Sequence, residues 1–287
     1  MKSMALSLIP AADLSLERLV LLINRVYADY FLPIWLDVDK FDDMCRVEDI
    51  ELSNSVVAVW NEEPVGLGLC ARRGTRGWLS GVGVLPFFRR RGIAGKMLRY
   101  LQEHAHGLQL ETLTLEVLAQ NQAGLALYRQ LGFTQHRELL VLTQTGLAAS
   151  ALVTPPEITS VPSVELLSYY AAWHVASPVW QRAPQTLSQY GTDLVGLGYR
   201  EGEELVGYVL YQVQCRHQAI YDLAVQPGHA RRVEIGRVLL RAVHSLQPAV
   251  DCYIVNLPVA EVLLTAFQQE GYRIWQRQYE MVWTVEG

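Results

Sequence analysis

The sequence repeats itself at a nearly constant offset, and this repeat limits the fold more than any other feature. Gly66 and Gly207 follow the same pattern of apolar strand and acidic turn, 141 positions apart. The Val-x-Pro pattern that starts at Val84 recurs at the same offset, and the pattern around Tyr128 recurs after 139 positions, with Phe267 in place of the tyrosine. Such a small drift indicates two copies of one structural unit. Two unrelated α/β segments are the alternative, because β-turn-β patterning can mimic part of the match.

The length of 287 residues fits two domains of roughly 140 residues each. Between the copies, residues 143–156 are rich in Thr, Ala, Ser and Gly and end in Pro155-Pro156, as expected of a linker. We therefore predict one domain over residues 1–145 and a second over 156–287.

Each copy is predicted to alternate strands with helices, which is typical of an α/β sheet flanked by helices. Apolar residues recur at helical spacing in three segments of the first copy, whose last helix ends at Gly132. The predicted helices are 15–27, 93–106 and 122–131, and the predicted strands are 55–61, 65–72, 78–85 and 110–118.

Composition excludes several classes of protein. With 51% hydrophobic and 18% charged residues, the chain can bury a sizeable core, which excludes disorder. A net charge of −5 argues against nucleic-acid binding. No apolar run reaches the roughly 18 residues of a membrane helix, so we expect a cytoplasmic protein with no membrane partner. Four cysteines without metal-site spacing predict reduced, mostly buried thiols and no metal: Cys45, Cys70, Cys215 and Cys252.

A basic, glycine-containing segment follows the strand that ends near Pro86. It reads Arg89-Arg90-Arg91-Gly92-Ile93-Ala94-Gly95-Lys96. Small residues let a ligand approach the backbone, and the unpaired amides at a helix start favour an anion such as pyrophosphate. A P-loop would need glycine at Arg90 and Ser or Thr at Met97, so that motif is excluded. A solvated basic helix start is the remaining alternative.

The same segment resembles the acyl-CoA motif of the GNAT superfamily of N-acetyltransferases. Arg89-x-x-Gly92-x-Ala94 matches that motif, and a second family pattern is present at Asn121, Tyr128, Gly132 and Phe133, with Gly124 where alanine is commoner. The resemblance covers about residues 50–140. It implies two tandem GNAT-type domains, each a mixed, mostly antiparallel sheet flanked by helices. It also implies that acetyl-CoA is held by amides around Val84 and residues 89–96, with Asn121 beside the pantetheine arm.

Glu116 is the candidate general base. An amine acceptor is mostly protonated at pH 7 and must lose a proton before it attacks a thioester. Glu116 lies on an apolar strand just before Asn121, where burial is expected to raise the pKa of a carboxyl group. Its Leu-Glu-Val context also resembles the base of the ribosomal-protein N-terminal acetyltransferases. A solvent-exposed glutamate at the strand end is the alternative.

Tyr128 is the candidate general acid. A phenol can protonate a departing thiolate, and the resemblance places the acid of the family at this position. Helical spacing also permits a plain core role for Tyr128. The second copy has Val255 where the first has Glu116, Phe267 where it has Tyr128, and Glu234 where it has Gly92. We therefore assign the chemistry, and one acetyl-CoA, to the first copy.

Three functional interpretations remain open at this point. The first is N-acetylation of a primary amine on a small molecule or peptide, and the second is a noncatalytic acyl-CoA sensor or scaffold. A tandem acyltransferase similar to mycothiol synthase is the third, although that family places its active site in the second copy. The sequence does not decide whether the chain forms a homo-oligomer.

The charge pattern also suggests what kind of amine is accepted. Seven acids lie between Asp37 and Glu51 against two basic residues, which would favour a cationic amine if this segment lines the acceptor groove. Tyr30, Phe31 and Trp35 could add apolar or cation-π contacts. A solvated acidic helix face is the alternative.

Overall fold

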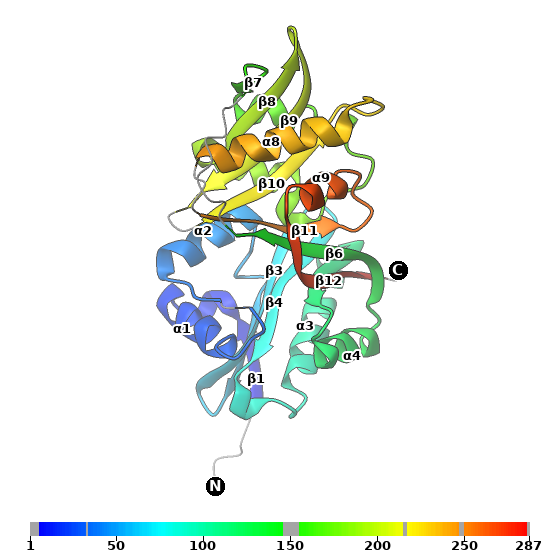
Figure 1. Cartoon of the computed structure of the whole chain (residues 1–287). Coiled ribbons are helices and arrows are strands. Elements are labelled where there is room, and N and C mark those ends of the chain that lie inside the picture. The colour runs from blue at the N-terminus through cyan, green and yellow to red at the C-terminus, as the bar shows by residue number, and fades with distance from the viewer. Residues whose placement is uncertain (1–5, 33, 146–154, 215–216, 247–249, 286–287) are drawn as a thin grey trace. The chain divides into compact units, whose positions relative to one another are not determined.

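The computed structural model describes residues 6–32, 34–145, 155–214, 217–246 and 250–285, and the chain divides into two compact units. Within the described residues, unit 1 contains 6–136 and 279–285, and unit 2 contains 137–278 (Figure 1). This division differs from the predicted boundaries at 145 and 156 because the end of the chain supplies a strand to unit 1. Most of the predicted linker, residues 146–154, lies outside the described residues.

Unit 1 is a mixed sheet with helices on both faces. Strands β1 to β4 pair antiparallel, β4 and β5 pair in parallel, and β12 follows β5 in the strand order. Helices α1 and α2 cover one face, and α3 and α4 cover the other (Figure 1). The elements are β1 Leu6–Pro10, α1 Leu16–Val26, α2 Val38–Glu48, β2 Val56–Trp60, β3 Glu63–Arg73, β4 Arg76–Val84, α3 Ile93–Gly107, β5 Thr112–Leu118, α4 Gln122–Gln130 and the end of β12 (Arg273–Thr284), with 3-10 turns at Ala11–Asp13 and Pro86–Phe88.

The predicted helices and strands of the first copy are confirmed to within a few residues. Helix α3 buries Met97, Leu101 and Ala105, which recur every four residues and so share one face. Helix α2 was not among the predicted helices, although a solvated acidic helix face was the alternative considered for this stretch. It begins where the Asp37 side chain accepts a hydrogen bond of 2.9 Å from the amide of Lys40.

Strands β4 and β5 pair over only part of their length. Their parallel ladder runs from Arg76 opposite Thr112 to Leu79 opposite Leu115, and both strands then continue without pairing to each other. The strands therefore diverge toward their carboxyl ends. Because α3 follows β4 and α4 follows β5, the first turns of both helices lie at this same edge of the sheet.

A β-bulge lies where the divergence starts. In the ladder between β3 and β4, Leu69 pairs with Gly81 and Cys70 pairs with Leu79, so Ser80 is the extra residue. A bulge bends its strand and redirects the backbone groups beside it. Here it turns the end of β4 away from β5.

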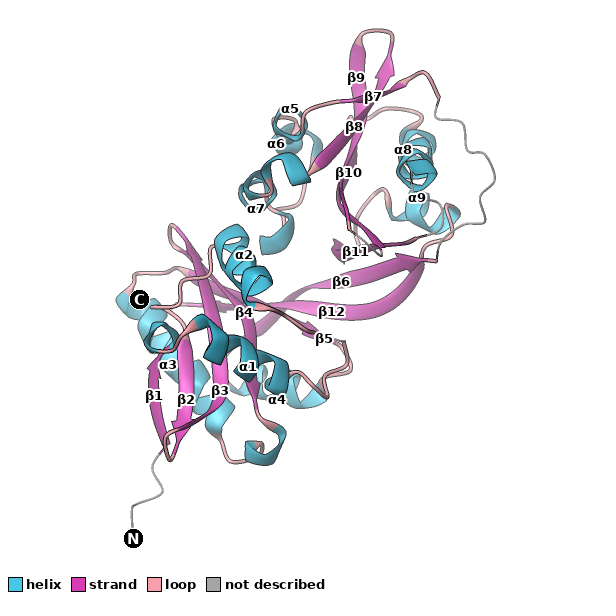
Figure 2. Cartoon of the chain, turned by 90° about the vertical axis from the view of Figure 1, so that its left-hand side faces the viewer, coloured by secondary structure: helices cyan, strands magenta, loops and turns pink. Residues whose placement is uncertain are grey.

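Unit 2 repeats this arrangement with a different set of helices (Figure 2). Its strand order is β6-β11-β10-β9-β8-β7, and the parallel ladder of β10 and β11 ends at Ile220 opposite Ile254. Tyr221 occupies a bulge 141 positions after Ser80, so the repeat extends to this local feature. The elements are β6 Thr134–Gln144, β7 Ile158–Ser160, α5 Ser163–Leu167, α6 Tyr170–Trp173, α7 Pro184–Gln189, β8 Val195–Glu201, β9 Glu204–Val213, β10 His217–Val225, α8 Arg232–Leu246, β11 Asp251–Pro258, α9 Leu264–Gln269 and the start of β12, with 3-10 turns at Trp180–Arg182 and Gly191–Asp193.

No helix in the described part of the chain is long and apolar enough to cross a membrane. Cys45, Cys70 and Cys252 are free thiols, and burial raises the pKa of Cys70 to about 12. Cys215 lies outside the described residues. Among those residues, no group of three or more His, Cys, Asp or Glu side chains is arranged to hold a metal ion.

Candidate active site

The start of α3 has the geometry of an anion site. Gly92 is the N-cap residue, with a φ of 74°, and no side chain caps the helix. A Cβ atom at Gly92 would meet nothing within 4 Å, so glycine is required here by the backbone angle and not by crowding. The carbonyl of Gly92 accepts the first helical hydrogen bond from the amide of Lys96, at 3.1 Å. The preceding amides, which belong to Ile93, Ala94 and Gly95, have no partner within the helix and can bind an anion.

Arg89 is engaged by the protein itself. Both terminal nitrogens of its guanidinium contact the Asp29 carboxylate at 2.6 Å, and its Nε donates to the Val84 carbonyl at 3.0 Å. One terminal nitrogen also donates to the carbonyl of Val26, at the end of α1. The Arg89 side chain therefore ties α1 to the end of β4, and Asp29 neutralises the charge that the sequence analysis assigned to the anion site.

The other cations of the segment differ in their surroundings. Arg91 lies between 5.3 and 5.7 Å from the ring centroids of Trp60, Phe87 and Phe88, which holds it by cation-π contacts. Arg90 has a left-handed φ of 62°, and both Arg90 and Lys96 are exposed. Arg90 and Lys96 are thus the side chains best placed to add charge beside the amides.

Glu116 lies on β5 immediately after its ladder with β4 ends, and it is half-buried. The indole Nε1 of Trp78 donates to its Oε2 at 2.7 Å. Trp78 is buried on β4, so this hydrogen bond fixes the carboxylate across the point where the strands separate. A glutamate in solvent at a strand end, the alternative considered above, does not describe this environment.

Asn121 begins α4. Its side-chain Oδ1 accepts a hydrogen bond of 3.0 Å from the amide of Gly124. A Cβ atom at Gly124 would lie 2.8 Å from Nδ2 of Asn121, so an alanine here would displace the amide group. Gly124, where alanine is commoner in the family, therefore leaves room for the amide group of Asn121 in this orientation.

Tyr128 belongs to a cluster of phenols. Its ring packs edge-on against Phe133, with centroids 5.8 Å apart. If deprotonated, Tyr128 would be repelled by the phenolate form of Tyr27 or Tyr30. Burial raises the pKa of Tyr128 well above that of a free phenol. Burial also raises the pKa of Tyr30, and a hydrogen bond with the Asn121 side chain opposes that rise. Tyr128 therefore stays protonated at neutral pH, as an acid catalyst must.

The sequence analysis missed the way in which α1 approaches the diverging strands. A Cβ atom at Gly81 would lie 2.6 Å from the hydroxyl of Tyr27, and one at Gly83 would lie 2.2 Å from Cγ1 of Val26. Two glycines on the strand face toward α1 thus permit this close contact. The Gly-x-Gly spacing of β4 is the signal that could have indicated it.

Three of the seven acids in the acidic stretch pair with nearby cations. Asp37 pairs with Lys40, Asp43 with Arg46, and Asp49 with Arg73 at 2.6 Å. Glu48 differs because it is buried at the end of α2 and accepts a hydrogen bond from the Ser80 hydroxyl at 3.4 Å. Of the acids in this stretch, Glu48 is the one that the structure places beside the diverging strands.

The second copy lacks an equivalent anion site. Helix α8 already begins at Arg232, so Glu234 lies inside the first turn where α3 has its N-cap glycine. Two nitrogens of Arg231 contact the Glu234 carboxylate at 2.9 and 3.0 Å. Phe267, the counterpart of Tyr128, is fully buried. The cation and the carboxylate at this helix start therefore neutralise each other.

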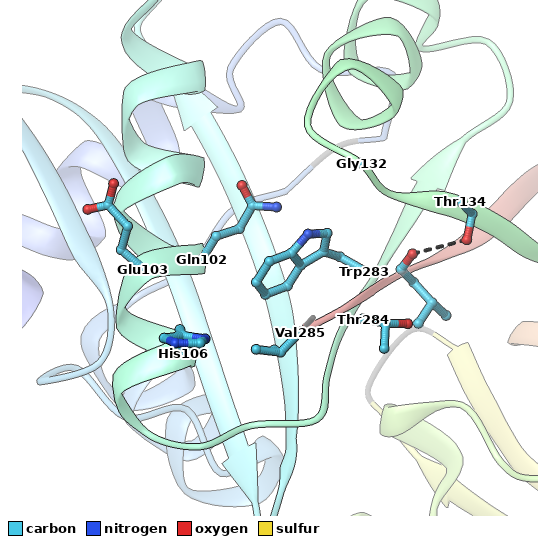
Figure 3. A pocket seen from close by; sticks show the side chains of 9 residues that line it. Gln102, Glu103, His106, Gly132, Thr134, Trp283, Thr284 and Val285 are labelled. Carbon is cyan, nitrogen blue, oxygen red and sulfur yellow. Dashed lines mark hydrogen bonds between the residues drawn. The ribbon is translucent and has the colours of Figure 1, made fainter. Parts of the chain in front are cut away.

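The pocket that Figure 3 shows lies at the opposite end of α3 from the anion site. It has a volume of about 700 Å³ and is bounded by Gln102, Glu103 and His106 of α3 and by Trp283 near the end of β12. None of the predicted site residues lines it.

Comparisons with known proteins agree with this geometry. Residues 21–133 match the acetyltransferase (GNAT) family. A GCN5-related N-acetyltransferase from Sphaerobacter thermophilus is similar in structure, with a TM-score of 0.73 at 18% identity over 100% of this chain and 97% of the other. A tandem GNAT protein from the clavulanic acid biosynthesis pathway has a TM-score of 0.73 at 16% identity over 99% of both chains.

A putative acetyltransferase from Pyrococcus horikoshii has a TM-score of 0.66 at 15% identity, over 100% of this chain and 91% of the other. No curated protein matches the sequence. Residues 21–133 therefore belong to the acetyltransferase (GNAT) family, within a chain that has the tandem GNAT fold.

Proposed function

We propose that unit 1 transfers an acetyl group from acetyl-CoA to a primary amine. The observation that supports this most directly is the edge where β4 and β5 diverge. There, the uncapped first turn of α3 accompanies a carboxylate held by Trp78 and a phenol kept protonated by burial. An anion site, a proton acceptor and a proton donor at one edge are what acyl transfer from a thioester to an amine requires.

The residues fit the cosubstrate, which would supply a thioester carbon for attack. The amides of Ile93, Ala94 and Gly95 would bind the pyrophosphate, with Arg90 and Lys96 adding charge. Asn121 and the end of β4 at Val84 would flank the pantetheine arm. The Arg89 side chain would act indirectly, because it fixes the end of β4 through the Val84 carbonyl.

The two proton transfers are assigned to separate side chains. The Glu116 carboxylate accepts a proton from the ammonium group of the acceptor, which leaves a nucleophilic amine. As the new C–N bond forms and the C–S bond breaks, the Tyr128 hydroxyl donates its proton to the sulfur. The phenolate then regains a proton from solvent or from the acetylated nitrogen, which must lose one.

The acceptor in this proposal is a primary amine on a small molecule or peptide. Glu48, next to Ser80, offers a buried carboxyl group that would accept a hydrogen bond from its ammonium group. Asp37, Asp43 and Asp49 contribute less to binding this group because each has a cation of its own.

Release of free CoA thiol from acetyl-CoA in the presence of a panel of amines tests the proposal. We expect turnover with at least one cationic amine, and calorimetry should give one acetyl-CoA per chain. Binding without turnover across the panel would favour a noncatalytic acyl-CoA sensor instead. Two acetyl-CoA molecules per chain would contradict the assignment of binding to unit 1 alone.

A further inference from the structure

Unit 2 contains a pocket of its own at the edge where β10 and β11 diverge. The pocket has a volume of about 120 Å³ and includes the ends of both strands at Pro227 and Asn256. Its other walls come from the segment around α6 and from the start of α8. The lining side chains that matter here are Tyr170, Trp173, His174, Arg182, Arg232 and Glu261.

The back of this pocket is a fixed polar network around Asp222, which is fully buried on β10. Its Oδ2 accepts a hydrogen bond from the Tyr208 hydroxyl at 2.8 Å and contacts His174 Nε2 at 2.9 Å. Its Oδ1 accepts from Arg182 at 3.3 Å, and the Nε of Arg182 donates to the carbonyl of Tyr221 at 2.8 Å. Because Asp222 and Arg182 neutralise each other, neither supplies a net charge to a ligand.

Two further charges in the lining lack such partners. Within the part of the chain that the structure describes, Arg232 forms no ion pair, and its Nε is buried without a hydrogen-bond acceptor. Among the described residues, the Glu261 carboxylate forms no ion pair, and it accepts a hydrogen bond from the amide of Leu263 at 3.5 Å. A buried donor without an acceptor is rare in folded proteins because its lost hydration is not replaced. The pocket thus presents a cation and an anion that do not pair with each other.

We propose that unit 2 binds a small zwitterion of the α-amino acid class in this pocket. The ligand carboxylate accepts from Arg232, and its ammonium group donates to Glu261. A side chain of modest size fits the volume and packs against the rings of Tyr170 and Trp173. A ligand that has only one of the two charges leaves the opposite charge of the pocket without a partner.

Isothermal calorimetry of the full chain tests the proposal with L-alanine, L-valine and L-phenylalanine, each at up to about 10 mM. This range detects binding with a Kd of about 1 mM or below. We expect saturable binding of at least one amino acid. N-acetyl-L-valine and L-valinamide, which each lack one charge, should bind at least about tenfold more weakly than L-valine. Absence of binding by all three amino acids, or equal binding of L-valine and its two derivatives, would overturn the proposal.

Matched variants locate the site. Arg232→Met and Glu261→Gln should each weaken binding by about tenfold or more, whereas Arg231→Met should not, because Arg231 is already paired with Glu234. Trp173→Phe should retain the binding heat and lose a change in tryptophan fluorescence that the wild type shows. Glu116→Gln, in unit 1, should bind the amino acid like the wild type. Loss of binding in Glu116→Gln alone would place the ligand in the acceptor site of unit 1 and refute the inference.

Discussion

The carboxylate of Glu116 accepts a hydrogen bond from the neutral indole of Trp78. This hydrogen bond fixes the orientation of the carboxylate. The same hydrogen bond ties two strands together at the position where they stop pairing. The proton transfer that we propose for Glu116 would therefore depend on Trp78, which the sequence analysis had not singled out.

Glu116→Gln should lower kcat by about 10²- to 10⁴-fold, the usual range for loss of a general base. The amide keeps an oxygen that can accept from Trp78, so acetyl-CoA affinity and folding should change little. Steady-state kinetics and calorimetry measure the two effects. The acid side of the pH–rate profile should flatten in the variant, and wild-type turnover between pH 6 and 9 would assign the proton to water or to the backbone.

Tyr128→Phe should lower kcat by about 10²-fold or more, with little change in acetyl-CoA affinity, because the hydroxyl acts only as the thiolate departs. Tyr27→Phe is the matched control, since Tyr27 is a neighbouring buried phenol to which we assign no proton transfer. A loss of acetyl-CoA binding without a loss of kcat would indicate that Tyr128 only packs. Equal losses in both variants would indicate that the phenols act as a group.

At the scale of elements, local patterns were sufficient to predict α1, α3, α4 and the strands between them. The uncapped start of α3 at Gly92 was predictable for the same reason, because it depends on consecutive residues of one helix. Contacts between distant residues were not predictable. Arg89 and Asp29 are 60 positions apart, and Trp78 and Glu116 are 38 apart. Helix α2 remained only an alternative because its acidic residues obscure a face that buries Phe41, Val47 and Glu48.

Gly92→Glu should abolish acetyl-CoA binding in calorimetry, because a carboxylate at the N-cap would repel the pyrophosphate. Gly92→Ala is the control for backbone strain. The φ of 74° at position 92 destabilises the folded alanine variant by about 1 kcal/mol, and the added Cβ atom meets nothing within 4 Å. We therefore expect the alanine variant to bind. Equal loss in both variants would attribute the effect to the backbone, and binding by the glutamate variant would place the anion elsewhere.

Helix α8 should make the stability of unit 2 sensitive to acid. His244 is buried, its Nε2 lies 3.0 Å from the Tyr272 hydroxyl oxygen, and burial lowers its pKa to about 4. The unfolded chain binds a proton below about pH 6.5 and the folded chain does not, so stability is lost as the pH falls from about 6.5 to about 4.

The size of this loss is about 3 kcal/mol for a pKa difference of roughly 2.5. Urea unfolding at pH 7 and at pH 4.5 measures it. His244→Leu removes the titration and should flatten this part of the pH dependence. A dependence that persists unchanged in His244→Leu would show that other groups cause it.

For the whole molecule, the sequence predicted a duplicated chain, but it did not predict that residues 279–285, which follow the second copy, belong to unit 1. The repeat identifies two copies of similar length, and the natural boundary lies between them. Nothing in the apolar pattern of residues 279–285 shows that they belong with the first copy. Their position depends on the hydrogen bond of 2.9 Å from the amide of Val285 to the carbonyl of Glu111, and on contacts such as that of Trp283 with Phe133.

A shortened chain that ends at Gln278 should lose acetyl-CoA binding, although it keeps every residue to which we assign that binding. The deletion removes the fully buried Met281 and the partly buried Trp283 from unit 1, and the loss of the methionine alone costs about 1.5 to 3 kcal/mol. It also exposes the edge of β5. A chain that ends at Val285 is the control. Calorimetry and thermal unfolding of the pair should differ, and equal affinity would show that unit 1 does not need the strand.

Because the end of β12 belongs to unit 1, it also affects the order in which the two units can be completed during synthesis on the ribosome. Domains usually fold as they emerge, with the N-terminal one first. Here unit 2 ends at Gln278, whereas unit 1 needs residues from the very end of the described chain. The first-made unit is consequently completed last, and its sheet has an open edge at β5 throughout synthesis. Residues 279–285 must be synthesised before the residues of the proposed acetyl-transfer site can be held in their final positions.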